Sequence, residues 1–191
     1  PFWLKPSVAT RGRVGPRWTS TAEGGGMAAL PPCLEGVSKQ QLLSAEVLYL
    51  KSRGIDDEAC AVLAPLLGAN PALRHLYIGY NSFGDEGTRQ LCEALAKAEA
   101  GGVQLLGLRH CRLGDGAAAA LADLLRGNTT LTEVGCDENE ITDAGAEALA
   151  AALGENKTLR HLYIGENPIT ESGRAKLLES KPPALQVHFD R

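Results

Sequence analysis

Aromatic residues are scarce in this chain of 191 residues, which has three Phe, two Trp and four Tyr, together 5% of the sequence. It also lacks a run of about 18 apolar residues, which excludes a membrane-spanning helix. Hydrophobic residues nevertheless make up 44% and charged residues 22%, ordinary values for a globular protein that exclude wholesale disorder. Leu, Ala and Gly are plentiful instead, and a core of small residues indicates regular stacking of small units.

Cysteine pairs with metal-ligand spacing are absent as well. The five cysteines form an odd number and contain no C-x-x-C motif; they are Cys33, Cys60, Cys92, Cys111 and Cys136. This pattern favours buried, reduced thiols over zinc ligands or disulfides, and therefore a reducing compartment. No Gly-rich stretch is followed by Gly-Lys-Ser/Thr, and no nucleophile–base set can be assembled. We therefore expect no enzyme activity, no cofactor and no metal site.

The net charge of −4 hides two parts of opposite sign. Residues 1–26 carry +3 and are rich in Pro, Gly, Ser, Thr and Arg, whereas the remainder carries −7. We interpret Met27 as the true start; the alternative is an organelle transit peptide, because the segment is basic, hydroxylated and nearly free of acidic residues. We expect residues 1–27 to be disordered or artefactual, residues 28–44 to form an N-terminal helical cap, and residues 45–191 to form the folded repeat domain, with five repeats and a last strand over residues 184–189.

The folded part repeats itself. Five segments fit the pattern L-x-x-L-x-L-x-x-N/C-x-L, and they begin at Ala45, Leu73, Val103, Leu131 and Leu159. Their starts lie 28, 30, 28 and 28 residues apart. A fixed period of this length is typical of a solenoid, in which each unit packs only on its neighbours.

Each unit has the marks of a short strand followed by a helix. Its fourth and sixth residues are apolar and share one face of a strand. An acidic residue in thirteenth place suits the N-cap or the first turn of a helix, and leucines four apart then form one apolar stripe. The acidic residues are Asp57, Asp85, Asp115, Asp143 and Glu171, and the leucine pairs are Leu63/Leu67, Leu91/Leu95, Leu121/Leu125 and Leu149/Leu153.

On these residues the chain resembles leucine-rich repeat proteins of the ribonuclease-inhibitor type. The segment ITDAGAEAL, residues 141–149, looks like repeats of NOD-like receptors and of Ran GTPase-activating proteins. The resemblance covers about residues 45–190 and departs from the pattern at Ala45, at Arg53 and at Lys181 in the fifth helix. It implies an α/β leucine-rich repeat solenoid, a horseshoe arc with parallel strands on the concave face and helices on the convex face.

The resemblance also implies that the concave, strand-borne face binds partners. The candidate protein-binding residues are the outward residues of the units; they are Tyr49, Lys51, His75, Tyr77, Tyr80, Arg109, His110, Glu133, Asp137, His161 and Tyr163. Tyr and Arg are enriched in binding hot spots, and we expect Tyr77, Tyr80, Arg109 and His110 to form the anchor. The alternative interpretation is that Tyr is simply a good strand residue that pairs across strands.

Two glycosylation sequons begin at Asn128 and Asn156. Both Asn residues occupy the same place in their units as Asn70. A recurring Asn after a helix is explained by the turn that it makes, so we expect a structural use for it.

The sequence therefore predicts a non-catalytic, intracellular scaffold or sensor module that binds a protein partner. Because the outward charges have both signs, a nucleic-acid partner is not expected; neither is a membrane, and we expect a cytoplasmic monomer. One alternative is a regulator of a small GTPase, from the resemblance to Ran GTPase-activating proteins. Another is a fragment of a longer NOD-like receptor repeat array.

Overall fold

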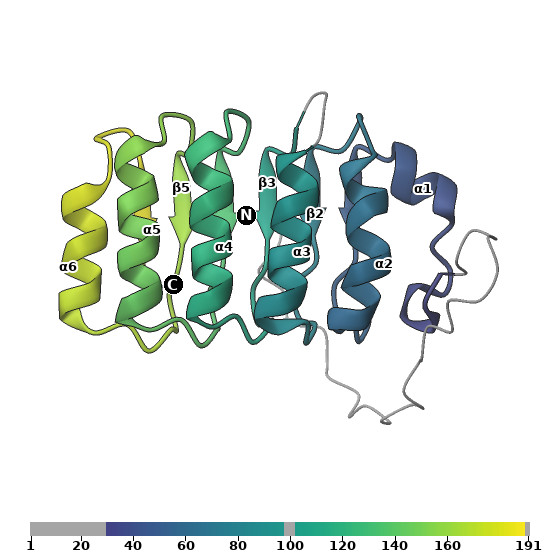
Figure 1. Ribbon diagram of the computed structural model, residues 1–191, viewed down its shortest axis with the longest axis horizontal. Coiled ribbons are helices and arrows are strands. Elements are labelled where there is room, and N and C mark those ends of the chain that lie inside the picture. Colours follow the sequence, from purple (N-terminus) through teal and green to yellow (C-terminus); the bar gives the residue numbers. More distant parts are fainter. Residues whose placement is uncertain (1–29, 98–101, 190–191) are drawn as a thin grey trace.

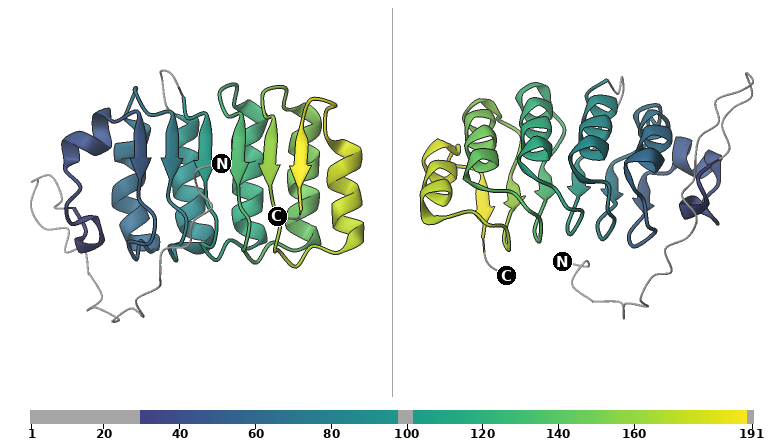
Figure 2. Two further views of the ribbon diagram at one scale, coloured as in Figure 1. Left: turned by 180° about the vertical axis from the view of Figure 1, so that it is seen from behind. Right: turned by 60° about the horizontal axis from the view of Figure 1, so that its bottom comes forward.

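One parallel sheet runs through the whole repeat region. The computed structural model describes residues 30–97 and 102–189. Its sheet has six strands in sequence order, and every neighbouring pair is parallel (Figures 1 and 2). The strands are β1 (Val47–Tyr49), β2 (His75–Tyr77), β3 (Leu105–Gly107), β4 (Glu133–Gly135), β5 (His161–Tyr163) and β6 (Gln186–His188).

A helix connects each strand to the next and returns the chain to the same end of the sheet, as parallel pairing requires. All of these crossover helices cover one face of the sheet and leave the other face open (Figure 2). They are α2 (Asp57–Gly68), α3 (Gly84–Ala96), α4 (Asp115–Gly127), α5 (Asp143–Glu155) and α6 (Glu171–Ser180). The predicted α/β solenoid is confirmed.

The layer of helices extends further along the solenoid than the layer of strands. Packed helices need about 8–10 Å between their axes, whereas neighbouring strands need only about 4.8 Å. The helices accordingly spread more widely than the strands in the right-hand view of Figure 2. The sheet therefore lies on the inner side of the curve, where its open face carries outward side chains close together.

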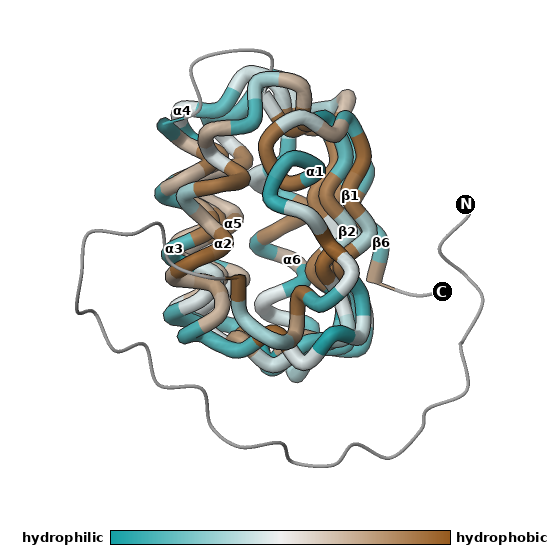
Figure 3. Tube along the Cα trace, turned by 90° about the vertical axis from the view of Figure 1, so that its right-hand side faces the viewer, coloured by the Kyte–Doolittle hydropathy of each residue, from teal (hydrophilic) through white to brown (hydrophobic). Residues whose placement is uncertain are grey.

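The core lies between the sheet and the helices, where apolar residues of both layers meet (Figure 3). Every predicted apolar strand position of the five units is buried: Leu48, Leu50, Leu76, Ile78, Leu106, Leu108, Val134, Cys136, Leu162 and Ile164. The eight leucines of the predicted helical stripes are buried too. The helix-period and strand-period patterns therefore predict the core correctly.

The acidic residues lie in the first turns of the helices and not at the N-caps. Asp115, for example, lies in the first turn of α4, whose N-cap is Gly114. Of the two expected positions, the first turn is confirmed and the N-cap is wrong. The reason is that the carboxylate reaches the next unit, where Asp115 Oδ1 accepts hydrogen bonds from the backbone N–H groups of Thr142 (2.8 Å) and Gly145 (2.9 Å).

The helix predicted before the first unit is present as α1 (Lys39–Ser44), with Ser38 as its capping residue. It follows a short 3₁₀ helix, η1 (Pro32–Leu34), and α1 packs against α2 at the end of the solenoid. The interpretation of residues 1–27 lies outside the described residues. Among the described helices, none has the length and apolar character needed to cross a membrane.

The sequon asparagines have structural uses, as predicted. The Asn156 side chain is buried, and its amide donates to the carbonyls of Leu125 (2.7 Å) and Asn128 (3.1 Å). The side-chain oxygen of Asn128, Oδ1, accepts hydrogen bonds from the backbone N–H groups of Thr130 (2.9 Å) and Leu131 (2.7 Å). These bonds join the end of one helix to the neighbouring unit.

Candidate functional site

A row of rings crosses the open face of the sheet. In-register pairing brings the last residues of neighbouring strands side by side. We call this row the ring ladder; in order from β1 to β6 its members are Tyr49, Tyr77, Gly107, Gly135, Tyr163 and His188. The ladder therefore has two rings, two glycines and two rings.

The rings at each end of the ladder form a stack. Tyr49 and Tyr77 lie with their centroids 5.0 Å apart and their planes within 4° of parallel. Tyr163 and His188 lie 4.4 Å apart at 12°. His161 completes the second stack, 5.7 Å from His188, with the nitrogens His161 Nδ1 and His188 Nε2 3.4 Å apart. The contacts hold the rings in place on an open surface.

His188 is a member of this face that sequence reasoning missed. The alternation Gln186-Val187-His188 in the predicted last strand was the signal that could have found it, because Val187 pairs with the buried Leu162 and His188 with the outward Tyr163. The repeat pattern ends before this strand, so position counting within the units does not reach it.

The ladder is interrupted in its middle. Among the described residues, a Cβ at Gly135 would meet nothing within 4 Å, whereas a Cβ at Gly107 would lie 3.4 Å from Cδ1 of Tyr77. The Tyr77 ring therefore leans over Gly107 and leaves the space above Gly135 open. Lys51, Arg109 and Glu133 also line this hollow. We call it the ladder gap.

The predicted anchor residues divide into two groups that meet at the ladder gap. Tyr77 belongs to the first stack and carries the Lys51 ammonium 5.3 Å above its ring centroid, with His75 at its edge. The other three, Tyr80, Arg109 and His110, cluster around Glu138. The ring of Tyr80 lies 5.5 Å from that of His110 and 5.7 Å from the Arg109 guanidinium.

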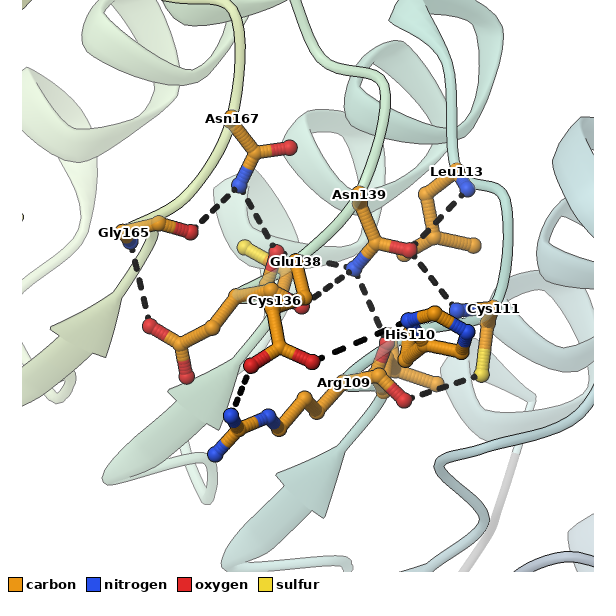
Figure 4. Close-up of polar contacts among 11 residues, drawn as sticks. Arg109, His110, Cys111, Leu113, Cys136, Glu138, Asn139, Gly165 and Asn167 are labelled. Carbon is orange, nitrogen blue, oxygen red and sulfur yellow. Dashed lines mark hydrogen bonds and ion pairs between the residues drawn. The ribbon is translucent and has the colours of Figure 1, made fainter. Parts of the chain in front are cut away.

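Glu138 joins this second group, and the sequence analysis did not select it (Figure 4). Its carboxylate pairs with the Arg109 guanidinium, and the other oxygen lies 3.7 Å from Nδ1 of His110. Only 16% of the Arg109 side chain is exposed, against 64% for His110. Arg109 is thus already held by Glu138, and His110 is the accessible part of the group.

The eighth residue of each unit is not a strand residue, contrary to the expectation that it lies on an outward strand position. The strands end at the fifth residue, and the eighth has a left-handed backbone: φ is 55° at Ser52, 58° at Tyr80, 55° at His110, 55° at Glu138 and 53° at Glu166. This conformation turns the chain away from the sheet. Tyr80 and His110 therefore project from the rim of the face.

An asparagine in ninth place stabilises this turn. Asn139 is buried; its Oδ1 accepts from the backbone N–H groups of Cys111 (2.8 Å) and Leu113 (3.1 Å), as Figure 4 shows. Its amide donates to the carbonyls of Leu108, Cys136 and Asp137. Asn81 of the second unit makes the corresponding hydrogen bonds to Arg53, Ile55 and Leu50 of the first unit. Each of these asparagines therefore joins the turn of its own unit to the preceding unit.

Two of the candidate binding residues are carboxylates of the fourth unit, Glu133 on β4 and Asp137 after it, and their surroundings differ. Asp137 was expected to face outward, but its side chain is only 3% exposed, so this expectation is wrong. The backbone N–H of Gly165 donates to Asp137 Oδ1 at 3.0 Å, and burial raises the pKa of its carboxyl. Glu133 is half-buried at the ladder gap; its backbone N–H donates to the carbonyl of Gln104 (3.0 Å), but its carboxylate has no hydrogen bond or ion pair with the described residues. Its carboxylate is therefore available for a further hydrogen bond or ion pair.

Glu133 acts electrostatically on both sides of the gap. Burial raises the pKa of the Tyr77 hydroxyl, and the charges of Tyr49 and Glu133 add to this effect. Burial likewise raises the pKa of Tyr163, with Glu133 the next contribution. On the cationic side, burial lowers the pKa of Lys51, and Arg109 adds to the shift.

The predicted burial of the repeat cysteines is confirmed: Cys60, Cys92, Cys111 and Cys136 are buried, and all five cysteines carry free thiols. Burial raises the pKa of Cys92 and of Cys111 to about 12, so neither thiol is a nucleophile near neutral pH. Among the described residues, no group of three or more His, Cys, Asp or Glu is placed to hold a metal ion.

Comparison with protein families identifies the units. A family model described as "Leucine Rich repeat" matches residues 69–92, 127–150 and 155–178. These are the stretches that contain Asn81, Asn139 and Asn167 in ninth place, where the first and third units have Arg53 and Cys111. The three matched stretches therefore share the asparagine that supports the rim.

Curated relatives extend the similarity. The chain is 37% identical to "NACHT, LRR and PYD domains-containing protein 5" of Mus musculus over 94 residues, which are 49% of this chain and 8% of the mouse protein. It is 34% identical to "Ribonuclease inhibitor" of Sus scrofa over 94 residues, which are 49% of this chain and 20% of that protein. The chain thus corresponds to a small part of these relatives.

Solved structures show the same fold. "Leiomodin-1 Actin-Binding Site 2 (ABS2)" aligns with a TM-score of 0.61 at 15% identity, over 74% of this chain and 84% of that one. The C-terminal domain of tropomodulin from Caenorhabditis elegans aligns with a TM-score of 0.62 at 13% identity, over 74% and 87%. At such identities the likeness concerns the fold alone.

Proposed function

Because this chain is built from leucine-rich repeats of the ribonuclease-inhibitor type, we propose that it is a protein-interaction scaffold whose partner binds the open face of the sheet. The observation that carries this proposal is the ring ladder. Tyr49 is 69% exposed and yet is stacked flat on Tyr77. Exposed, rigid aromatic rings supply large contact area with little loss of side-chain freedom, and Tyr is enriched in binding hot spots.

Preorganisation supports the proposal. The Tyr49–Tyr77 stack and the ion pair of Arg109 with Glu138 fix long side chains before a partner arrives. Ordering such side chains on binding costs about 0.5–1.5 kcal/mol each. A face that is already ordered retains more of its contact energy as affinity.

The charges of the face favour a protein over a nucleic acid. Lys51 and Arg109 lie on one side of the ladder gap and Glu133 on the other. Nucleic-acid binding surfaces have a dominant basic stripe, whereas protein interfaces combine both signs. We assign the scaffold a non-catalytic role in the cytoplasm, as a monomer.

A second candidate is a sensor segment within a larger receptor. The 37% identity to "NACHT, LRR and PYD domains-containing protein 5" favours it. In that case the same face would bind the activating protein. A regulator of a small GTPase, predicted from the resemblance to Ran GTPase-activating proteins, is tested by single-turnover GTP hydrolysis with candidate GTPases; we expect no acceleration.

Site-specific photo-cross-linking tests the location of the binding face. A photoreactive phenylalanine analogue replaces Tyr49 on the sheet face or, as the matched control, the exposed Glu58 on α2. Expressed in the native cell and irradiated, the first variant should cross-link to a discrete protein and the second should not. Equal cross-linking from both positions, or cross-linking from α2 alone, would overturn the proposal.

Affinity measurements with the captured protein then test the residues. Tyr77→Ala and Arg109→Ala remove members of the predicted anchor, and together they should weaken binding by tenfold or more, the size of effect expected for hot-spot residues. Thermal denaturation of the same variants controls for loss of folding. An unchanged Kd would mean that these two side chains are not the anchor.

A further inference from the structure

The strands β2 and β5 have the same sequence but different neighbours. Both read His-Leu-Tyr, and an arginine precedes each of them. On β2, the next strand places Leu105 beside His75 and Gly107 beside Tyr77. On β5, the next strand places His188 beside Tyr163. The histidine of β5, His161, therefore has a second imidazole within reach.

The imidazoles of His161 and His188 meet edge to edge. Their ring centroids lie 5.7 Å apart, and Nδ1 of His161 lies 3.4 Å from Nε2 of His188. The difference between these two distances is about equal to the sum of the two distances from a ring centre to its own nitrogen. The two nitrogens therefore lie nearly on the line that joins the ring centres. Because the planes differ by only 24°, each nitrogen directs its N–H bond or its lone pair at the other.

This geometry suits a proton better than a metal ion. Imidazole nitrogens bind zinc at about 2.0–2.1 Å, so a metal in line between the two rings would hold their nitrogens about 4.1 Å apart. The observed 3.4 Å is shorter than this. In neutral imidazole, one nitrogen is a donor and the other an acceptor. Two neutral rings can therefore share one proton here, whichever ring carries it.

The number of nitrogens limits how many protons the pair can take while it stays in contact. The ring that donates can bind the first added proton on its other nitrogen; the shared hydrogen bond is then charge-assisted and stronger. The second added proton must bind the nitrogen that accepts this hydrogen bond. Two N–H groups and two positive charges would then face each other, so the contact must open.

Charged groups of the neighbouring unit favour the first of these protons. Glu133 stands in register with His161 on the adjacent strand β4. Burial raises the pKa of the Asp137 carboxyl, and the charge of His188 acts against that rise. Burial also raises the pKa of the Tyr163 hydroxyl, and Glu133 and Asp137 add to this effect. One positive charge on the pair is thus offset by two carboxylates, whereas a second would also repel the first.

We propose that His161 and His188 form a proton-operated latch at the β5–β6 end of the open face, closed with at most one added proton and opened by the second. His188 stacks on Tyr163 at 4.4 Å, and its backbone carbonyl accepts the N–H of Ile164 at 3.0 Å. Opening therefore changes the last members of the ring ladder. The consequence for a bound partner rests on the proposed function; the latch itself does not.

NMR of protein labelled with ¹³C-histidine tests the latch without a partner. The ring signals of His75, His161 and His188 are followed from about pH 8 to about pH 4.5, in a buffer that contains EDTA to remove metal ions. The signals of His161 and His188 should each report two steps, with the second proton bound at least tenfold more weakly than the first. Nuclear Overhauser effects between the two rings should persist through the first step and disappear in the second. His75, in the same strand sequence, should show one step.

Substitutions by glutamine, which is neutral over this pH range, locate the effect. His188→Gln should leave His161 with a single step, and His161→Gln should do the same for His188. His75→Gln is the matched control and should leave both steps in place. Circular dichroism checks that each variant is folded, and the Tyr49–Tyr77 contact checks the wild type at the lowest pH.

Three results would overturn the latch. They are a single step at both His161 and His188 of the wild type, two steps that persist in whichever glutamine variant is folded, and loss of the Tyr49–Tyr77 contact together with the second step. The last result would mean that the whole domain unfolds in acid. If cross-linking from position 49 still captures a protein in any of these cases, the binding face stands and only the latch is wrong.

The captured protein then tests the effect on binding. Lowering the pH through the second step should weaken its affinity for the wild type by about two- to tenfold more than for folded His188→Gln, because side chains released by the latch must be ordered again. An equal change in both would mean that the latch does not regulate binding. Two steps in the NMR titration with no protein captured on the face would leave the latch standing and the scaffold function wrong.

Discussion

The Asp115 carboxylate holds Thr142 of the next unit by two hydrogen bonds, from its backbone N–H at 2.8 Å and from its hydroxyl at 2.7 Å. Thr142 is the N-cap of α5. Asp143 makes the same pair of bonds to Thr170, the N-cap of α6. One unit thus organises the start of the next helix, and the solenoid is joined along its helical edge by a repeated polar contact.

Replacing Asp115 should therefore destabilise the fold through its neighbour. We expect Asp115→Ala to lower the free energy of unfolding by about 1–2 kcal/mol, the usual effect of losing a cap or a charge-assisted hydrogen bond. Urea denaturation measures it. Glu171→Ala is the matched control, because Glu171 has the same place in the last unit, and no helix follows α6 among the described residues. Equal losses in both variants would contradict the inter-unit role.

The same contact makes stability depend on pH. Hydrogen bonds from Thr170 lower the pKa of the Asp143 carboxyl below its ordinary value. A pKa lower in the folded than in the unfolded chain contributes stability that is present above the unfolded value, about 3.9, and is lost as the pH falls through the folded value. We expect the stability advantage of the wild type over Asp143→Asn to shrink below roughly pH 4. An advantage independent of pH would argue against this assignment.

Most of the fold could be predicted from the repeat period. Because the same apolar spacing recurs in five units, one interpretation of strand and helix accounts for Leu76 and Leu149 alike, and both are buried as predicted. The inter-unit contacts of Asp115 were not predictable in this way. A first-turn carboxylate has a local explanation in the helix dipole, and only three-dimensional stacking brings it to Thr142.

The candidate site was predictable as far as simple alternation holds. Tyr49 and Tyr77 obey it and lie on the open face, side by side. Asp137 and Tyr80 lie beyond the fifth residue, where the strand has ended and a left-handed residue turns the chain, so alternation misplaces them. The ladder gap depends on which way the Tyr77 ring leans, and no spacing rule predicts that.

Asn139 should be among the most sensitive positions of the rim. It is buried, its Oδ1 accepts two backbone hydrogen bonds, and its NH2 group, which has two hydrogens, lies within hydrogen-bond distance of three carbonyl oxygens. We expect Asn139→Ala to lower the free energy of unfolding by about 3 kcal/mol or more, because several buried backbone groups lose their partner at once. Chemical denaturation measures the loss. A loss below about 1 kcal/mol would mean that solvent replaces the amide there.

The third unit suggests a milder replacement at the same position. Its ninth residue is Cys111, whose thiol lies 3.6 Å from the carbonyl oxygen of Ile78 and 3.5 Å from that of Arg109. A thiol therefore contacts carbonyls like those that the Asn139 amide reaches, but it offers no acceptor comparable to Oδ1. We expect Asn139→Cys to be less destabilising than Asn139→Ala. The reverse order in the same denaturation series would show that the carbonyl contacts contribute little.

Substitution of the left-handed residues of the rim by glycine should relieve backbone strain, in contrast to the destabilising substitutions of Asn139. Glu166 is exposed and has a φ of 53°, a conformation that costs a non-glycine residue roughly 1 kcal/mol and glycine almost nothing. We expect the Glu166→Gly variant to be more stable than Glu166→Ala by about 0.5–1 kcal/mol, because both lose the same side chain and only glycine relieves the backbone. At His110, where φ is 55°, glycine should have the same advantage over alanine, but both variants should be destabilised relative to the wild type by the lost contacts with Tyr80 and Glu138. Thermal denaturation of both pairs checks the contrast, and an Ala variant as stable as Gly at position 166 would contradict it.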